Sequence, residues 1–441
     1  MSQSKENTSV PITSFSINAT AFVLSCIGFV LAADYLSNLQ ITVLVAGIYA
    51  VGVIALEFTF LKTYANQTTG LDYSISKGWD LPTAMVKLVG LYVTLGCISL
   101  IYLIFPEYHG SFYHDYYVLL KAFLPYWLVL AIPYFLVVNR YMVNPKDGYW
   151  HVGNWLLGNW LVGRRGDTDI AYVVQHFLGW LVKAFFLPLM LVYLVGKINY
   201  FQNLDWQTLD DGFKPFYDFA FNSLFYIDLL IVTVGYCLTF RVFDAHIRST
   251  EYSFLGWAVA LMCYQPFWSL ISDQYIAYDD GNGWGHWLWN SDIAYVVWGC
   301  MILALIAVYV WATLMFGIRF SNLTHRGIIT HGAFRLTKHP AYVSKNLSWW
   351  LISMPFLTHA HPSEALRMSA LLLLLNFIYF MRARTEERHL SHDPDYVAYA
   401  EYMEKHGMFR KLGQWVPALR FKPKSLFNTD IELKPVVFKS K

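Results

Sequence analysis

Long apolar runs with almost no charge recur along this chain, and they constrain its fold more than any other feature. A helix needs about 20 mainly apolar residues to cross a bilayer. Ten runs approach or exceed that length: 19–33, 41–61, 83–105, 117–138, 171–195, 219–240, 254–271, 293–316, 340–357 and 366–381. None alternates polar with apolar residues as the strands of a membrane barrel do. The sequence therefore predicts an all-α, polytopic integral membrane protein with about ten transmembrane helices.

Composition supports a membrane location. Hydrophobic residues make up 56% of the 441 positions and charged residues only 14%, which is too little polar surface for a soluble globule of this size. We therefore expect the membrane and molecules dissolved in it to be the partners of this chain, and no nucleic acid.

The distribution of basic residues predicts the topology. Cytoplasmic connections hold the excess of Lys and Arg in membrane proteins. Counted over the predicted connections, together with Lys345 and Arg367 just inside the runs that follow them, those after even-numbered runs hold 13 Lys and Arg, and those after odd-numbered runs hold 3. We expect both termini and every even connection to be cytoplasmic, including a basic tail after residue 407.

Two ionisable residues fall deep inside predicted spans. Lys183 follows the start of its run at Ala171 by twelve residues, and Asp228 precedes the end of its run at Phe240 by twelve. At about 1.5 Å per residue, both would lie roughly 18 Å from the cytoplasmic side. Intramembrane charges either pair or mark a functional path. A structural ion pair is the favoured interpretation, and a polar patch in a substrate cavity is the alternative.

A polar, basic loop from Gly327 to His339 precedes the last two runs. The connection between these runs is short, so the hairpin returns His339 and the pair Glu386–Glu387 to the same membrane face. Pro340 suits the first turn of a helix, whose free N–H groups can bind an anion.

The two ends of this hairpin carry polar side chains that suit a pocket better than lipid. These are Tyr342, Ser344, Lys345, Asn346 and Ser348 on one side, and Arg382, Arg384, Glu386 and Glu387 on the other. Two carboxylates could hold an ammonium group and ribose hydroxyls, while basic groups hold a carboxylate. From the residues alone this is a cofactor-sized polar pocket, and an ordinary charged membrane interface is the alternative.

A short cytoplasmic helix is expected after the hairpin. Asp393 suits its N-cap, Pro394 its first position, and Gly407 its end. Tyr396, Tyr399 and Tyr402 would line one face of it. His325, His331, His389 and His392 are not spaced as metal ligands, and no metal is expected.

The residues between Asn322 and Tyr402 resemble a known family. The strings Gly327-Ile-Ile-Thr330, Gly332-Ala-Phe-Arg335 and Lys338-His-Pro-Ala-Tyr342 are similar to the S-adenosylmethionine motif of isoprenylcysteine carboxyl methyltransferases and related membrane phospholipid methyltransferases. Glu386-Glu387, followed by Tyr396 and Tyr399, resembles the second half of that signature. Lys338 stands where arginine is usual, Ala333-Phe334 where Pro-Tyr is usual, and Ser344 where glycine is frequent.

The resemblance implies a membrane methyltransferase that uses S-adenosylmethionine and methylates a lipid or lipidated, isoprenylcysteine-like acceptor, with its active site facing the cytoplasm. It divides the chain into an N-terminal bundle of unassigned role (1–290) and a catalytic membrane domain with a basic tail (291–441), in which the hairpin and the short helix form the cofactor pocket. The implied catalytic residues are Arg335, His339 and Glu387. The implied cofactor-binding residues are Thr330, His331, Gly332, Arg335, Lys338, His339, Pro340, Tyr342, Glu386 and Glu387.

Two other functions remain open at this point. Integral-membrane sterol or isoprenoid reductases resemble the chain in size, in span number and in a His-Pro-x-Tyr element, and their NADPH would suit Arg335, Lys338, Arg382 and Arg384. A transporter or scaffold is the non-enzymatic alternative, with Lys183 and Asp228 marking a transport path.

Overall fold

The computed structural model describes residues 12–75, 77–158 and 167–422. The polar leader 1–11, Arg164, Arg165 and the end of the basic tail after residue 422 lie outside these residues. The helices are α1 (Phe15–Ala32), α2 (Asn38–Leu56), α3 (Leu81–Ile104), α4 (His114–Tyr141), α5 (Gly148–Leu157), α6 (Ile170–Gln202), α7 (Phe213–Cys237), α8 (Phe254–Leu261), α9 (Asp273–Tyr275), α10 (Trp284–Leu288), α11 (Asp292–Phe316), α12 (Pro340–Ser353), α13 (Pro362–Leu390), α14 (Pro394–His406) and α15 (Arg410–Trp415). The two strands, β1 (Ser249–Thr250) and β2 (Thr324–His325), pair antiparallel.

The mainly helical fold agrees with the sequence, but ten transmembrane helices are not confirmed. Within the described residues, eight helices are long and apolar enough to cross a membrane. The run 254–271 is broken, because α8 ends at Leu261 and Pro266, which cannot donate a helical hydrogen bond, follows. The run 340–357 forms α12, whose 14 residues reach only about 21 Å.

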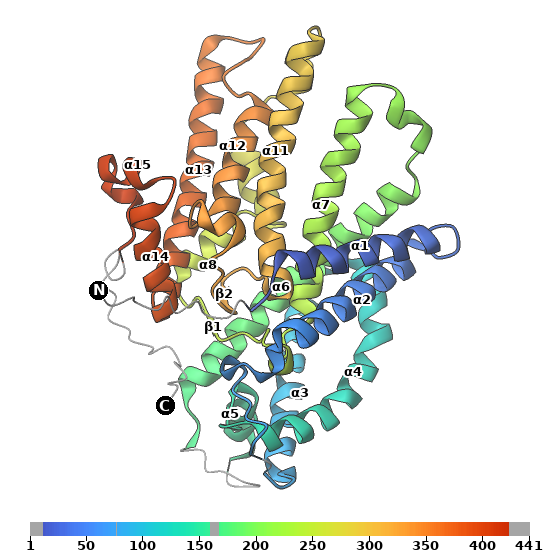
Figure 1. Cartoon of the computed structure of the whole chain (residues 1–441), viewed down its shortest axis with the longest axis vertical. Coiled ribbons are helices and arrows are strands. Elements are labelled where there is room, and N and C mark those ends of the chain that lie inside the picture. The colour runs from blue at the N-terminus through green and yellow to red at the C-terminus, as the bar shows by residue number, and fades with distance from the viewer. Residues whose placement is uncertain (1–11, 76, 159–166, 423–441) are drawn as a thin grey trace, which may run out of the picture.

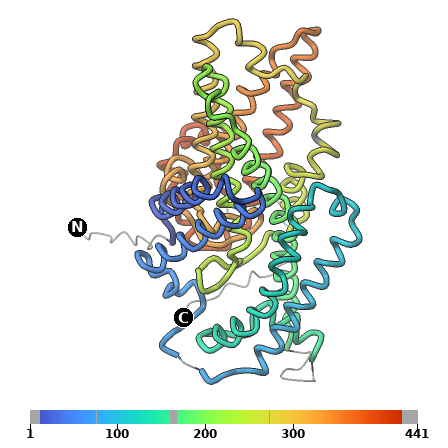
Figure 2. The backbone as a smooth tube through the Cα atoms, turned by 90° about the vertical axis from the view of Figure 1, so that its right-hand side faces the viewer, coloured from blue at the N-terminus to red at the C-terminus, as the bar shows by residue number. Residues whose placement is uncertain are grey.

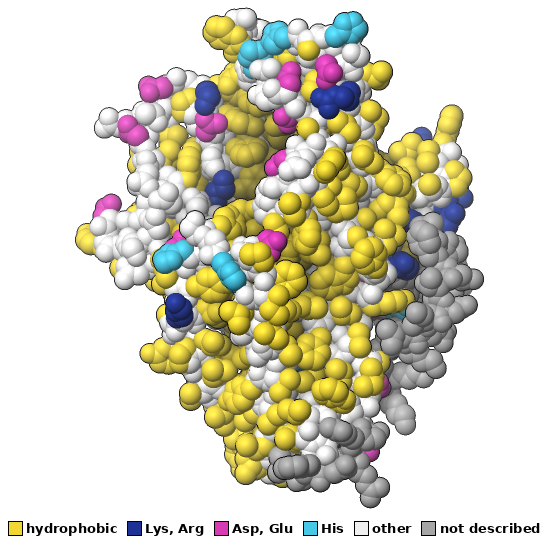
Figure 3. Space-filling view, turned by 180° about the vertical axis from the view of Figure 1, so that it is seen from behind, with side chains coloured by type: hydrophobic (Ala, Val, Ile, Leu, Met, Phe, Trp, Pro, Cys, Tyr) yellow, Lys and Arg dark blue, Asp and Glu magenta, His cyan; other side chains and the backbone are white. Residues whose placement is uncertain are grey.

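The helices extend toward two ends of the molecule. Figure 1 shows α7, α11, α12 and α13 reaching one end, while α3, α4 and α5 gather at the other. Figure 2, turned by 90°, shows the same separation, with α1 and α2 beside the middle of the molecule. Large apolar side chains cover much of the surface in Figure 3, where charged side chains are sparse. This outer surface suits lipid contact.

The connections that follow α2, α4, α7 and α11 meet on one side of the molecule, which we call the polar end. Leu71 pairs with Met142 across an isolated β-bridge, Arg241 donates to the carbonyl of Thr69 at 3.1 Å, and Arg319 binds Glu57 at 2.8 Å. On the other side, Gln202 at the end of α6 donates to Ala33 after α1. These contacts bring the even-numbered connections together, while the predicted topology of the termini and connections stays a prediction.

Lys183 and Asp228 do not form the predicted ion pair. Lys183 Nζ donates to Thr239 Oγ1 at 2.8 Å, whereas Asp228 accepts from Tyr309 at 2.8 Å and Thr313 at 2.7 Å. The first 13 residues of α6 extend past the C-terminal end of α7, because Lys183 contacts Thr239, which lies just past that end. Lys183 therefore lies beside the end of α7 and not at the depth of Asp228. Asp228 faces α11 instead.

The two predicted regions of the chain pack directly against each other. Asn18 of α1 donates to the carbonyl of Leu314 in α11, and one buried apolar cluster joins Ile318 to residues of α1, α2, α6 and α7. The division at residue 290 stays a prediction about function, because the helices on its two sides share a core.

Buried histidines at the polar end predict acid sensitivity. Burial, and then the charges of Arg248 and His389, lower the pKa of His325 to about 3; burial, and then neighbouring arginines, lower the pKa of His246 well below its usual value. Both rings are therefore neutral in the folded protein but take up protons near pH 6.5 when unfolded. The contribution of these rings to the free energy of unfolding is therefore fully present above about pH 6.5. It falls as the pH drops, by up to about 1.4 kcal/mol per pH unit for each ring.

Thermal unfolding in detergent measures this effect. The midpoint should be level between pH 8 and pH 7 and should fall progressively from pH 6.5 to pH 5. Asp393 Oδ2 lies 3.3 Å from His325 Nε2, but burial raises the pKa of Asp393, which weakens its compensation of a charged ring. A midpoint that is unchanged or higher at pH 5 would contradict the prediction.

Candidate functional site

A two-stranded ladder brings an N-terminal connection against the start of the hairpin region. In it, Ser249 pairs with His325 and Thr250 with Thr324. Arg248 N also donates to the carbonyl of His325, and Glu251 N to the carbonyl of Leu323. The segment between α7 and α8 therefore forms one wall of the space beneath α13.

The start of α12 meets the end of α13, as the hairpin predicts. His339 is the N-cap of α12 and Pro340 its first residue. His339 Nε2 lies 3.3 Å from Glu387 Oε1, and its Nδ1 lies 3.8 Å from Glu386 Oε2. Two chain segments 48 residues apart thereby place an imidazole between two carboxylates.

Glu387 is the centre of a buried charge cluster. Its side chain is 5% exposed, and besides His339 it binds Lys338 Nζ at 2.7 Å and the guanidinium of Arg384. Lys338 also binds Glu404 of α14 at 2.9 Å, and Arg384 donates to the carbonyl of Arg420. Because Glu387 joins α12, α13 and, through Lys338, α14, its first role is to hold these elements in place.

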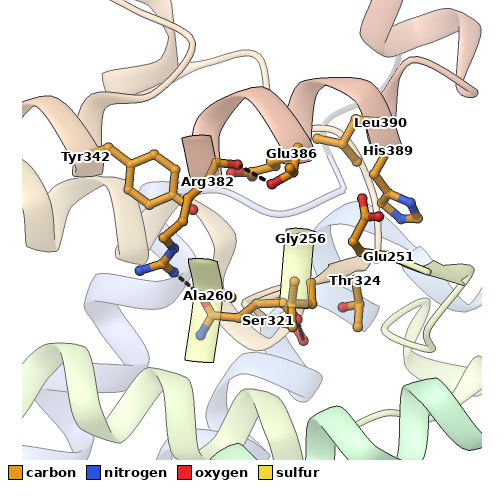
Figure 4. Close-up of a pocket in the computed structure, with 13 residues that line it drawn as sticks. Glu251, Gly256, Ala260, Ser321, Thr324, Tyr342, Arg382, Glu386, His389 and Leu390 are labelled. Atoms are coloured by element: carbon orange, nitrogen blue, oxygen red, sulfur yellow. Dashed lines mark hydrogen bonds between the residues drawn. The ribbon is translucent and has the colours of Figure 1, made fainter. Parts of the chain in front are cut away.

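A cavity of about 470 Å³, counting its open mouth, lies beside this cluster. Figure 4 shows Tyr342, Arg382 and Glu386 on one side of it, and Glu251, Ser321 and Thr324 on the other. Its lining residues are Glu251, Gly256, Ala260, Ser321, Asn322, Leu323, Thr324, Tyr342, Arg382, Thr385, Glu386, His389 and Leu390. The cavity is open to the outside, so a ligand can enter it.

Arg382 is a buried cation in the cavity wall. Its residue is 6% exposed, and its guanidinium lies 5.6 Å, 5.2 Å and 4.9 Å from the rings of Tyr264, Tyr342 and Tyr379. Its Nη2 donates to Asn322 Oδ1 at 3.2 Å. No carboxylate of the described residues forms an ion pair with it. A buried charge favours a partner, so this position suits the anionic group of a ligand.

The predicted site residues separate into three groups. Tyr342 and Glu386 line the cavity. Lys338, His339 and Glu387 form the charge cluster beside it, with Pro340 opening α12. The remaining four, Thr330, His331, Gly332 and Arg335, do not line it.

These four residues lie in or beside the loop before α12. Thr330 and Arg335 are exposed, and a Cβ added to Gly332, whose φ is +62°, would lie 2.5 Å from Met315 Sδ in α11. The loop therefore packs against α11. In the structure, these four residues do not reach the cavity. Their cofactor and catalytic roles stay predictions.

The helix after the hairpin begins and ends where its sequence predicts, but one of its three tyrosines does not lie on the predicted face. Asp393 caps α14 and accepts from Asp395 N, and the helix ends at His406 before Gly407. Tyr396 and Tyr399 are buried, and Tyr399 donates to the carbonyl of Phe334 at 2.7 Å. Tyr402 is 57% exposed, so the predicted three-tyrosine face is wrong. Each three-residue step turns a helix by about 300°, which carries the third ring away from the first.

Sequence reasoning missed the polar residues that complete the cavity: Glu251, Ser321, Asn322, Thr324 and Thr385. Glu251 is an acidic residue three positions before the apolar run that begins at residue 254, and that position was the available signal.

No curated protein and no solved structure matches the chain. A family model does match residues 293–392, which are 100 of the 441 residues and contain α12, α13 and all but the first residue of α11. The part of the chain that closes the cavity on the α13 side is thus similar to the Isoprenylcysteine carboxyl methyltransferase (ICMT) family, which confirms the resemblance seen in the sequence.

Proposed function

We propose that this protein is a membrane methyltransferase that uses S-adenosylmethionine and methylates a lipid or lipidated, isoprenylcysteine-like acceptor at its polar end. One observation carries the proposal. The Lys338-His339-Pro340 element and the Glu386-Glu387 pair, which resemble the two halves of the family signature, meet beside an open cavity lined by polar side chains. The family match over residues 293–392 supports the reaction class.

The residues of the cavity fit the donor. Glu386, with its side chain 39% exposed, can accept hydrogen bonds from an ammonium group or ribose hydroxyls. Arg382 lacks a carboxylate partner among the described residues and can bind a carboxylate. S-adenosylmethionine supplies an activated methyl group when bound. The residues of this chain then mainly orient the two reactants and exclude water, which an in-line displacement requires.

The position of the cavity fits an acceptor with an apolar tail. Gly256 and Ala260 of α8 line it, and α8 belongs to an apolar cluster that also contains Leu372 and Leu375 of α13. The carboxylates and the guanidinium lie at the polar end of the same helix pair. An acceptor could therefore place its reacting group among the polar side chains while its tail remains among apolar ones.

Ligand binding by detergent-purified protein tests the proposal. S-adenosylhomocysteine, the demethylated donor, should bind saturably, and NADPH should not. Glu386→Gln removes a charge that faces the cavity. The variant should bind S-adenosylhomocysteine about 10-fold more weakly or worse, because hydrogen bonds to charged groups contribute about 1.5–3 kcal/mol. Glu401→Gln, the same change on an exposed position of α14, should leave binding unchanged.

The opposite outcomes have definite meanings. Saturable NADPH binding without S-adenosylhomocysteine binding would favour the reductase. Binding of neither ligand would remove the support for both enzymes and favour the transporter.

A further inference from the structure

Glu251 is a buried carboxylate that reaches the cavity from outside the family match. It follows β1 directly, in the connection between α7 and α8, whereas the match begins at residue 293. It is 2% exposed and lines the cavity across from Glu386 and Leu390 of α13 (Figure 4). A residue from the N-terminal bundle thus takes part in the candidate site.

One oxygen of this carboxylate is fixed by the protein. Glu251 Oε1 accepts from Arg388 Nη2 at 3.0 Å and from Ser253 N at 2.8 Å. Its backbone carbonyl accepts from Trp257 Nε1 at 2.7 Å. A Cβ added to Gly256 would lie 2.5 Å from Glu251 Cγ, so only glycine lets the first turn of α8 approach this side chain so closely. These contacts leave the carboxylate little freedom to turn.

The other oxygen is buried without a partner. Glu251 Oε2 has no hydrogen bond within the described part of the chain. An unsatisfied buried acceptor costs about 1–3 kcal/mol, more when it is charged. A ligand in the adjoining cavity that donates an N–H or O–H group would remove this cost. An ammonium group fits best, because hydrogen bonds between charged partners are the strongest.

We propose that Glu251 determines ligand specificity by accepting a hydrogen bond, through Oε2, from an ammonium group of the ligand in this cavity. Glu386 supplies a second carboxylate on the facing wall, and Arg382 a cation for a carboxylate. The cavity therefore selects an α-amino-acid head group. The inference rests on the proposed function, in which both the donor and an S-prenylated cysteine with a free amine carry such a head group.

Glu251→Gln tests the proposal, because the amide can keep an acceptor toward Arg388 while turning an N–H₂ group toward the cavity. If the donor's ammonium binds here, the variant should bind S-adenosylhomocysteine at least 10-fold more weakly and bind 5′-methylthioadenosine, which lacks the head group, as wild type does. If the acceptor's ammonium binds here, wild type should methylate S-farnesylcysteine in preference to its N-acetyl form, and the variant should lose that preference. Either shift supports the proposal and identifies the source of the ammonium.

Two ratios decide the outcome: the affinity for S-adenosylhomocysteine relative to 5′-methylthioadenosine, and the methylation rate of S-farnesylcysteine relative to its N-acetyl form. If Glu251→Gln changes neither ratio, the proposal is overturned. Asp244→Asn is the matched control, because Asp244 is a buried acid in the same connection that does not line the cavity, so it should alter neither ratio. If Glu251→Gln does not fold, Gly256→Ala, which displaces the Glu251 side chain without changing charge, decides by the same two ratios. A wild-type protein that neither binds S-adenosylhomocysteine nor methylates either cysteine would overturn the proposed function itself.

Discussion

Replacing Arg326 with lysine is expected to cause the largest loss of stability of any conservative substitution in this protein. Arg326 is 2% exposed, and its guanidinium donates to four backbone carbonyls: Ala245 at 2.7 Å, Gly235 at 2.9 Å, Phe320 at 2.8 Å and Leu238 at 3.0 Å. Gly235 and Leu238 belong to the end of α7, where helix carbonyls lack intrahelical partners and favour a cation. One side chain thus joins the end of α7 to the two connections that form the polar end.

Lysine keeps the charge but cannot serve the same four acceptors, because its three donors radiate from one atom whereas the guanidinium presents a planar fork. Each buried carbonyl left without a donor costs about 1–3 kcal/mol. The thermal unfolding midpoint of the variant in detergent should fall sharply. Arg367→Lys, at a residue whose side chain is 54% exposed and pairs with Glu364, is the control and should leave it unchanged. An unchanged midpoint for Arg326→Lys would show that water replaces the lost donors.

The meeting of His339 with Glu387 could be predicted from sequence because it depends on chain length and local signals. Pro340 fixes where α12 starts, a short connection returns the chain, and α13 ends in charged residues after its apolar turns. The caps of α14 follow the same local rules, and Asp393 and Gly407 both stand at its observed ends. Such features need no knowledge of neighbouring helices.

Features that depend on how helices pack could not be predicted in this way. Apolar runs place Lys183 and Asp228 at equal depth only if each run begins and ends at the membrane surface, whereas α6 continues well past the end of α7. Asp228 finds Tyr309 and Thr313 only because α11 lies against α7. Glu251 likewise reaches the cavity only through the β1–β2 ladder, which no periodicity indicates.

Replacing Glu387 with glutamine is expected to abolish detectable S-adenosylhomocysteine binding and to destabilise the fold. The substitution keeps the shape of the side chain but removes the one charge that Lys338, His339 and Arg384 share. Breaking a buried ion pair costs about 3–5 kcal/mol, because the remaining charge loses its compensation. Here two basic side chains, of Lys338 and Arg384, are only 11% and 6% exposed. They would repel each other and displace the start of α12 from the cavity wall.

Glu386→Gln, at the adjacent residue, separates structure from binding. Its side chain is 39% exposed and its Oε2 lies 3.8 Å from His339 Nδ1, so this variant should keep the wild-type thermal midpoint while binding S-adenosylhomocysteine more weakly. Glu387→Gln should lower both quantities, and combining it with Lys338→Met should cost less stability than the two single changes together, because both remove the same contact. A Glu387→Gln protein with the wild-type midpoint and affinity would show that the cluster neither holds the hairpin nor shapes the cavity.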